Sequence, residues 1–304
     1  MPRALVDEYR DESRVIPVEI EYDTWGDPNN PTLLLIMGFG AQMIVWEDDF
    51  LRALADTGFH VVRFDNRDCG LSTLLDGVSV DVEKVVMAAL MEDEIPPVPY
   101  TLSHMAADVV GLMSHLGIER AHVLGVSMGG MIAQVMAIEH PHRVASLISV
   151  MSMPGEPETM QSTPEAMEAL VSVPPADRAG YIEHSLKYQA FQSRKYRSDE
   201  LSRARAAREY DRMYYPDGAN RQMAAIYASG RRSEALQKLT VPTLVIHGND
   251  DTLISLRGGE RTAELIPGAE LLVVEDMGHD LPRPLWPRII DAVANHCAKV
   301  RLTA

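Results

Sequence analysis

The sequence predicts an α/β protein with a mostly parallel central sheet, helices on both faces of that sheet, and a helical cap. Strand-like and helix-like segments alternate in both halves of the 304-residue chain, a pattern typical of a sheet covered by helices. Between Pro154 and about Leu236 the β pattern disappears. The stretch Gly125-Val126-Ser127-Met128-Gly129 lies where an apolar run meets a helix-like segment, which indicates a sharp strand-to-helix turn.

The expected elements follow from apolar runs and from helical spacing. The first strand, residues 15–22, is rich in β-branched residues and is expected to begin the sheet in antiparallel pairing. Further strands are expected at residues 33–36, 61–64, 121–124, 144–150, 241–248 and 270–274. Helices are expected at residues 46–57, 102–116, 128–140, 260–265 and 285–298.

The organisation along the chain follows from these elements. Residues 1–153 are expected to form the first part of the core, residues 154–236 a helical cap, and residues 237–304 the second part of the core. An insertion at residues 73–100 contains an apolar helix-like piece, 82–91, and is a possible lid. The same helix-like piece could instead form a dimer contact or be buried in the core.

Composition limits the partners. The net charge of −16 argues against nucleic acid and against anionic membranes. Two cysteines make no disulfide framework, the first residues lack the features of a signal peptide, and glycines interrupt the longest apolar stretch. We therefore expect a soluble cytoplasmic protein without stable membrane insertion, and a possible homodimer. Residues 176–232 differ, with 12 basic and 7 acidic side chains, or about +5.

Ser127 is the candidate nucleophile. Glycines two residues before and two residues after it leave room for a tight crossing of strand and helix, and such a turn exposes the serine hydroxyl. The Met128 N–H would then lie at a helix N-terminus, where it favours negative charge. The alternative is an ordinary packed turn.

A serine needs a base and an acid that orients the base. His279 follows one expected strand, and Asp250 and Asp251 follow another. Each therefore comes just after the carboxyl end of a strand, where open parallel sheets place their sites. Either aspartate could orient the histidine.

With these motifs in view, the chain resembles the α/β-hydrolase family over nearly its whole length. The runs that carry the resemblance are Leu33 to Gly40, the turn Arg63-Phe64-Asp65-Asn66-Arg67-Asp68-Cys69-Gly70-Leu71-Ser72, Gly248 to Asp251, and Gly278-His279. Within the family, the chain is more similar to bacterial carboxylesterases and lipases that resemble aclacinomycin methylesterase. Three features carry that closer likeness: the motif D-N-R-D-x-G-x-S, Met37-Gly38 in place of His-Gly, and the run Met277 to Pro282.

The resemblance implies a catalytic triad of Ser127, Asp251 and His279. It favours Asp251 over Asp250 because the family's aspartate stands three residues after the glycine. It also implies an oxyanion hole made by the backbone N–H groups of Phe39 and Met128, with no cofactor and no metal. Met37 departs from the family pattern, since many relatives carry histidine there.

Other candidates are expected to be structural. Asp65 and Arg67 are interpreted as a charged pair that braces a loop, and His140-Pro141-His142 as the end of a surface helix. No cluster has the spacing of metal ligands, and no glycine-rich motif implies a dinucleotide or a nucleoside triphosphate.

The substrate pocket is expected to include Met37, Gly38, Met153 and Tyr215. Methionines gather near the expected strand ends, and methionine fills irregular apolar space, so an apolar acyl or methyl ester is the expected substrate. Seven of the 10 tyrosines fall within residues 154–236, and two or three of them are expected to contact substrate.

These expectations combine into a serine-dependent hydrolase of carboxylic esters, of the carboxylesterase or lipase type, that forms an acyl-enzyme. Two alternatives use the same triad, a cofactor-free perhydrolase and a carbon–carbon bond hydrolase. A third alternative is a non-catalytic ligand receptor on the same scaffold.

Overall fold

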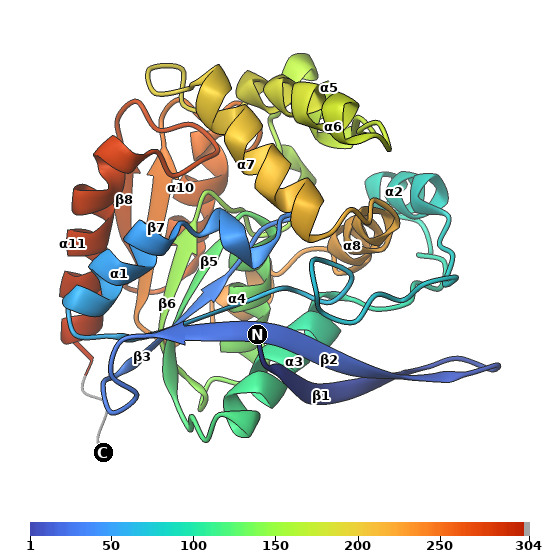
Figure 1. The fold of residues 1–304 in the computed structure, drawn as a ribbon. Coiled ribbons are helices and arrows are strands. Elements are labelled where there is room, and N and C mark those ends of the chain that lie inside the picture. Colours follow the sequence, from blue (N-terminus) through green and yellow to red (C-terminus); the bar gives the residue numbers. More distant parts are fainter. Residues whose placement is uncertain (301–304) are drawn as a thin grey trace.

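The fold is organised around one eight-stranded sheet. The computed structural model describes residues 1–300, and its strand order is β1-β2-β4-β3-β5-β6-β7-β8 (Figure 1). The strands are β1 Arg3–Arg10, β2 Val15–Trp25, β3 Thr32–Ile36, β4 His60–Phe64, β5 Ala121–Val126, β6 Val144–Val150, β7 Thr243–Gly248 and β8 Glu270–Val274. The pairs β1–β2 and β2–β4 are antiparallel, and the other pairs are parallel.

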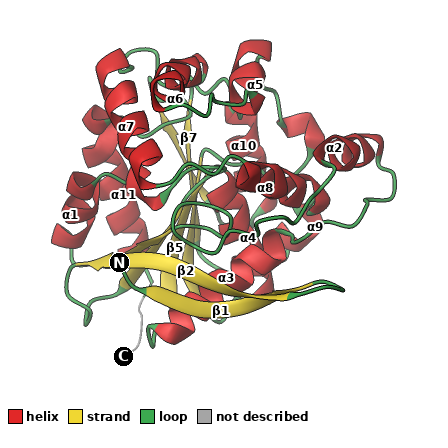
Figure 2. Ribbon diagram, turned by 45° about the vertical axis from the view of Figure 1, so that its right-hand side comes forward, coloured by secondary structure: helices red, strands yellow, loops and turns green. Residues whose placement is uncertain are grey.

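The first strand was missed by sequence reasoning. β1 pairs with β2 along its length and forms a long hairpin that extends from one side of the molecule (Figure 2). Its residues alternate between a buried Ala4 and charged or exposed neighbours, so no apolar run marks it. The expected antiparallel start at residues 15–22 is therefore the second strand of the sheet.

Helices cover both faces of the sheet. They are α1 Asp48–Asp56, α2 Val82–Met91, α3 Leu102–His115, α4 Met128–Glu139, α5 Pro164–Val171, α6 Arg178–His184, α7 Asp199–Arg212, α8 Asp217–Ala228, α9 Ser233–Leu236, α10 Leu256–Leu265 and α11 Trp286–Ala298. Short 3-10 turns are Met43–Val45, Pro157–Thr159, Ser185–Ala190 and Arg283–Leu285. One apolar cluster includes α3, α4 and Leu265 of α10, and the other includes α1 and α11.

The strand β3 shows why both layers are needed. Leu34 and Ile36 pack into the α3–α4 cluster, whereas Leu33 and Leu35 pack into the α1–α11 cluster. Successive side chains of a strand point to opposite faces, so a strand that is apolar at every position needs cover on both sides. This observation agrees with the predicted class of α/β fold.

Between β6 and β7 the chain is helical. Helices α5 to α9 lie over one end of the sheet, and α7 runs across the top of the molecule (Figure 1). This is the segment in which the β pattern disappears from the sequence. Its division into a separate cap at residues 154–236 stays a prediction, as does a lid at residues 73–100, where α2 packs against α8.

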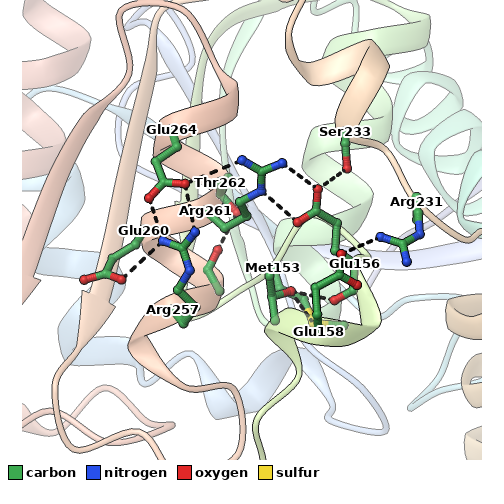
Figure 3. Close-up of polar contacts among 12 residues, drawn as sticks. Met153, Glu156, Glu158, Arg231, Ser233, Arg257, Glu260, Arg261, Thr262 and Glu264 are labelled. Carbon is green, nitrogen blue, oxygen red and sulfur yellow. Dashed lines mark hydrogen bonds and ion pairs between the residues drawn. The ribbon is translucent and has the colours of Figure 1, made fainter.

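Polar contacts hold together the two ends of this helical segment (Figure 3). The Arg261 guanidinium donates two hydrogen bonds to the Glu156 carboxylate, at 2.8 and 3.0 Å, and the Ser233 hydroxyl donates a third at 2.6 Å. Arg232 donates to the carbonyl oxygens of Met153 and Gly230. The two ends of the helical segment, near Glu156 and near Arg232, are therefore tied to each other and to α10.

Arg67 is a buried cation that joins the turn after β4 to α3. Its guanidinium donates two hydrogen bonds of 2.6 Å to the Asp108 carboxylate, and one of 2.9 Å to Asp7 of β1. The Arg67 and Asp108 side chains are 1% and 3% exposed, so neither group can be solvated if the other is removed. Arg67 therefore has a structural role, as predicted, but the expected pair of Asp65 with Arg67 is wrong: Arg67 pairs with Asp108 and Asp7, and Asp65 pairs with Arg212.

The described part of the chain, residues 1–300, contains no helix with both the length and the apolar character needed to cross a bilayer.

We expect Arg67→Met to lower the free energy of unfolding by about 3–5 kcal/mol, because Asp108 is left buried without a partner. Urea denaturation measures this loss. The double variant Arg67→Met/Asp108→Leu should recover most of it. As a control, Arg178→Met breaks the exposed pair with Asp211 and should leave the free energy of unfolding nearly unchanged, because solvent screens that pair. An equal loss in the single and double variants would contradict the assignment.

Candidate functional site

Ser127 lies in a strained turn between β5 and α4. Its backbone angles are φ 54° and ψ −122°, a combination that a non-glycine residue adopts only when its surroundings enforce it. A Cβ at Gly125 would overlap the Gly129 carbonyl, and a Cβ at Gly129 would overlap the Ile36 carbonyl of β3. The two glycines are therefore needed for the close crossing that raises Ser127 at the end of β5, as the sequence pattern predicted.

Two N–H groups near Ser127 are free to bind an anion. The Met128 N–H opens α4, and the Phe39 N–H belongs to the turn after β3. Within residues 1–300 neither group donates to another backbone or side-chain acceptor. A Cβ at Gly38 would lie 3.1 Å from the Ser127 Cβ, so the turn that carries Phe39 runs directly beside the serine.

Side chains from elsewhere in the chain fix the turn that carries Phe39. The Asn66 side-chain amide donates to the Met37 carbonyl at 3.0 Å, and the Gly40 N–H donates to the Gln222 amide oxygen at 2.9 Å. Gln222 in turn donates from its amide nitrogen to the Arg67 carbonyl at 2.9 Å. The orientation of this turn therefore depends on contacts with residues that are distant in the sequence.

His279 and Asp251 form a hydrogen-bonded pair. The two side chains meet at 2.7 Å between Nδ1 of His279 and one carboxylate oxygen of Asp251. The other oxygen accepts the backbone N–H groups of Leu253 and Ile254, at 2.9 and 3.0 Å. Burial raises the pKa of Asp251, but the neighbouring His279 and His247 outweigh burial and lower that pKa to about 2.

Asp250 points elsewhere. Its carboxylate accepts the backbone N–H of Arg194 at 3.1 Å and pairs with the Arg194 side chain at 3.3 Å. Of the two adjacent aspartates, only Asp251 contacts His279.

Within residues 1–300 the Ser127 hydroxyl makes no hydrogen bond to His279. Hydrogen bonds between a nucleophile and its base often tighten only when substrate is bound.

The helical segment supports the histidine. The backbone N–H of His279 donates to the Phe191 carbonyl at 2.7 Å. The Phe191 ring lies edge-on to the His279 imidazole, with 6.0 Å between the ring centroids. The Ser193 hydroxyl accepts the Gly278 N–H and donates to Asp280. The orientation of His279 thus depends on residues outside the sheet core.

The predicted pocket residues divide into two groups. Met37 and Gly38 are buried beside Ser127. Met153 is also buried, but its carbonyl accepts from Arg232 and its sulfur accepts from Thr159. The Tyr215 hydroxyl accepts a hydrogen bond from Arg221 at 2.8 Å, so its polar end already has a partner within the protein.

A charged turn after β4 connects this site to the helical segment. Arg212 of α7 lies 2.6 Å from the Asp65 carboxylate, and Arg221 of α8 makes two hydrogen bonds of 2.8 Å to Asp68. All four side chains are largely buried. Sequence reasoning did not find the two arginines, because each lies about 150 residues from its partner and carries no motif.

A surface cavity of about 360 Å³ lies away from these residues, beside Val135, Glu139 and Arg232. It adjoins the C-terminal half of α4, whereas Ser127 precedes the first residue of that helix. Over residues 1–300 no group of three or more histidine, cysteine, aspartate or glutamate side chains is arranged to hold a metal ion.

Comparison with known proteins matches the chain to a described family. Residues 31–282 match the family model described as "alpha/beta hydrolase fold". The chain is 26% identical to rhodomycin D methylesterase DnrP of Streptomyces peucetius, over 89% of this chain and 92% of that one.

Two solved structures share the fold. One is an enol-lactonase from Burkholderia xenovorans, with a TM-score of 0.71, 23% identity, and coverage of 98% of this chain and 100% of the other. The second is the meta-cleavage product hydrolase CumD from Pseudomonas fluorescens, with a TM-score of 0.73, 21% identity, and coverage of 93% and 95%.

We expect Gly129→Ala to lower the free energy of unfolding by about 1–3 kcal/mol, because the new methyl group overlaps the Ile36 carbonyl, which cannot move without the rest of β3. Thermal or urea unfolding measures the loss. Gly268→Ala is the matched control: Gly268 has φ 74° and open space around it, so that variant reports backbone strain without overlap. A loss at Gly129 no larger than at Gly268 would contradict the close crossing.

The lowered pKa of Asp251 gives a pH dependence of stability. Because the folded pKa of about 2 lies below the ordinary 3.8, the ionised carboxylate stabilises the folded state. This contribution, about 2 kcal/mol, is complete above pH about 4 and is lost as the pH falls towards 2. We expect the difference in unfolding free energy between wild type and Asp251→Asn to shrink over that window.

The measurement is urea denaturation at a series of pH values. Asp250→Asn is the control, because its carboxylate pairs with Arg194 near the surface. A wild-type advantage over Asp251→Asn that stays constant down to pH 2 would be inconsistent with the buried pair.

Proposed function

Because the chain belongs to the α/β-hydrolase family, we propose that it is a serine-dependent hydrolase of carboxylic esters. The observation that carries this proposal is the His279–Asp251 hydrogen bond of 2.7 Å, together with the strained turn that exposes Ser127. The similarity to a methylesterase over 89% of the chain supports an ester as the substrate. The proposed triad is Ser127, His279 and Asp251, with Phe39 and Met128 as the oxyanion donors.

The proposed reaction proceeds through an acyl-enzyme. The Ser127 hydroxyl attacks the ester carbonyl carbon while the free Nε2 of His279 accepts its proton. Asp251 stays ionised, holds the imidazole through Nδ1 and stabilises the imidazolium. The carbonyl oxygen becomes an oxyanion between the N–H groups of Phe39 and Met128.

Collapse of this intermediate expels the alcohol, which takes the proton from His279. A water molecule then attacks the acyl group, with His279 again accepting a proton, and a second tetrahedral intermediate releases the acid and restores Ser127. Each oxyanion donor contributes about a hundredfold or more to the rate. The substrate is the one partner that this reaction requires, and a homodimer and a cytoplasmic location stay predictions.

We expect Ser127→Ala to lower kcat for ester hydrolysis by at least about a thousandfold, because the nucleophile is removed while the fold is kept. A p-nitrophenyl ester series from acetate to palmitate measures this loss and also gives the preferred acyl length. Ser114→Ala is the control, since Ser114 lies on the exposed side of α3. Near-normal turnover by Ser127→Ala, with an unchanged circular dichroism spectrum, would refute the nucleophile.

The same experiment separates the alternatives. Faster turnover of a vinylogous diketone than of any ester would favour a carbon–carbon bond hydrolase, and peracid formation with hydrogen peroxide would favour a perhydrolase. Tight ester binding without turnover by the folded wild type would favour a receptor.

A further inference from the structure

One face of α7 looks from the helical segment towards the core. Residues 205, 209 and 212 are spaced by four and three, so their side chains lie on the same side of this helix. Arg212 reaches the core, where it pairs with Asp65 and donates to the Gln42 amide oxygen at 2.8 Å. The Gln42 amide nitrogen donates in return to the Glu209 carbonyl at 2.7 Å. Arg205 and Glu209 therefore face the space between α7 and the core.

The charged ends of Arg205 and Glu209 make no direct polar contact within residues 1–300, although the Arg205 charge opposes the rise that burial causes in the pKa of Glu209. Both residues are half-buried, and within residues 1–300 neither side chain makes a hydrogen bond or an ion pair. By contrast, Arg203 on the outer side of the same helix donates two hydrogen bonds to Glu183 of α6. Half-buried charges without partners cost folding free energy, so their retention on an inward face points to a ligand.

Two tyrosine hydroxyls likewise make no hydrogen bond within the described residues 1–300. The hydroxyls of Tyr210 and Tyr214 donate to backbone carbonyls, at 2.7 and 3.2 Å. The hydroxyls of Tyr181 and Tyr188 make no hydrogen bond within the described residues 1–300, although both side chains are half-buried. Because a phenol can both donate and accept a hydrogen bond, these two hydroxyls can bind either water or a ligand.

The tyrosines connect this face of α7 with the candidate site. The Tyr188 ring packs on Phe191, 5.8 Å between centroids, and Phe191 packs on the His279 imidazole at 6.0 Å. Burial raises the pKa of Tyr188 and of Tyr181, and the nearby Glu209 raises both further. Burial also raises the pKa of Asp280, beside His279, and Arg205 opposes that rise. Tyr188 therefore reaches towards His279 through Phe191, and Glu209 lies near enough to Tyr181 and Tyr188 for its charge to act on both phenols.

We propose that Arg205, Glu209, Tyr181 and Tyr188 form a polar subsite, which binds hydroxyl, phenol or keto oxygens of an uncharged ester at a distance from its scissile bond. The subsite rests on the proposed ester hydrolysis and names its substrate class. Arginine supplies only donors, glutamate supplies acceptors, and each phenol supplies both. The opposite charges of Arg205 and Glu209 disfavour a substrate with a net charge of either sign.

This subsite revises the expected substrate. The methionines near the strand ends led to an apolar ester. The core side of the site retains that character at Met37, but the α7 side is polar. A substrate with an apolar body and several oxygen substituents fits both sides.

The test compares two esters that differ only in hydroxyl groups, methyl 2-naphthoate and methyl 3,7-dihydroxy-2-naphthoate. We expect wild type to prefer the dihydroxy ester by about tenfold or more in kcat/KM, the effect of one or two added hydrogen bonds. Glu209→Gln, Arg205→Met and Tyr188→Phe should each reduce that preference about threefold or more. The readout in each variant is the ratio of the two kcat/KM values, so a change in turnover that is common to both esters cancels.

The matched control is Glu200→Gln, because Glu200 is exposed near the start of the same helix, makes no ion pair within residues 1–300 and should leave the preference unchanged. Equal kcat/KM values for the two naphthoate esters in wild type would overturn the subsite. A wild-type preference for the analogue with a carboxylate in place of the 7-hydroxyl would overturn the uncharged class.

Failure of the proposed function is distinguishable from failure of the subsite. If no ester is hydrolysed, including p-nitrophenyl acetate, the proposed function fails, and binding of the two naphthoates to wild type is then measured by fluorescence. Tighter binding of the dihydroxy ester, lost in Glu209→Gln, would still support the subsite. Equal binding of the two would overturn it. Thermal unfolding adds a second readout, since removing an unpaired charge in Glu209→Gln should leave the melting temperature unchanged or raise it.

Discussion

The turn at residues 65–68 is the constraint on which the rest of the structure depends. Four consecutive side chains leave this turn in different directions, and each contacts a different part of the fold. The contacts are Asp65 with Arg212 of α7, Asn66 with the Met37 carbonyl, Arg67 with Asp108 of α3, and Asp68 with Arg221 of α8. Because the paired charges are buried, removing one partner leaves the other without solvation, and this favours the arrangement in which α3, α7 and α8 all lie against the turn.

The groups proposed for catalysis and the residues proposed to select the substrate lie in different parts of the molecule. The strained serine, the two free N–H groups and the Asp251–His279 pair lie at the ends of strands, where the sheet holds them rigidly. The helical segment supports His279 through Phe191 and through Ser193, and otherwise presents the polar face of α7. A family that keeps one core and varies this segment can keep its chemistry while changing its substrates.

The helical segment is also fixed in place rather than loosely attached. Arg232 and Glu156 tie its first and last residues together, and Gln222 ties α8 to the turn that carries Phe39. Helix α8 and the turn that carries Phe39 are therefore joined directly, through the Gln222 side chain.

The sequence by itself determined the local features: the glycine turn at Ser127, the spacing of Asp251 after Gly248, and most helices and strands. These features depend on steric limits and periodicity within a few residues, which a single sequence displays. Only the tertiary structure decided that β1 joins the sheet edge, that Asp251 rather than Asp250 meets His279, and that α7 turns unpaired charges inward. β1 pairs with a strand only 5 to 18 residues away, but no apolar run marks it. The other outcomes depend on contacts between residues 28 to 170 positions apart, and no local pattern specifies which buried charge will find which partner.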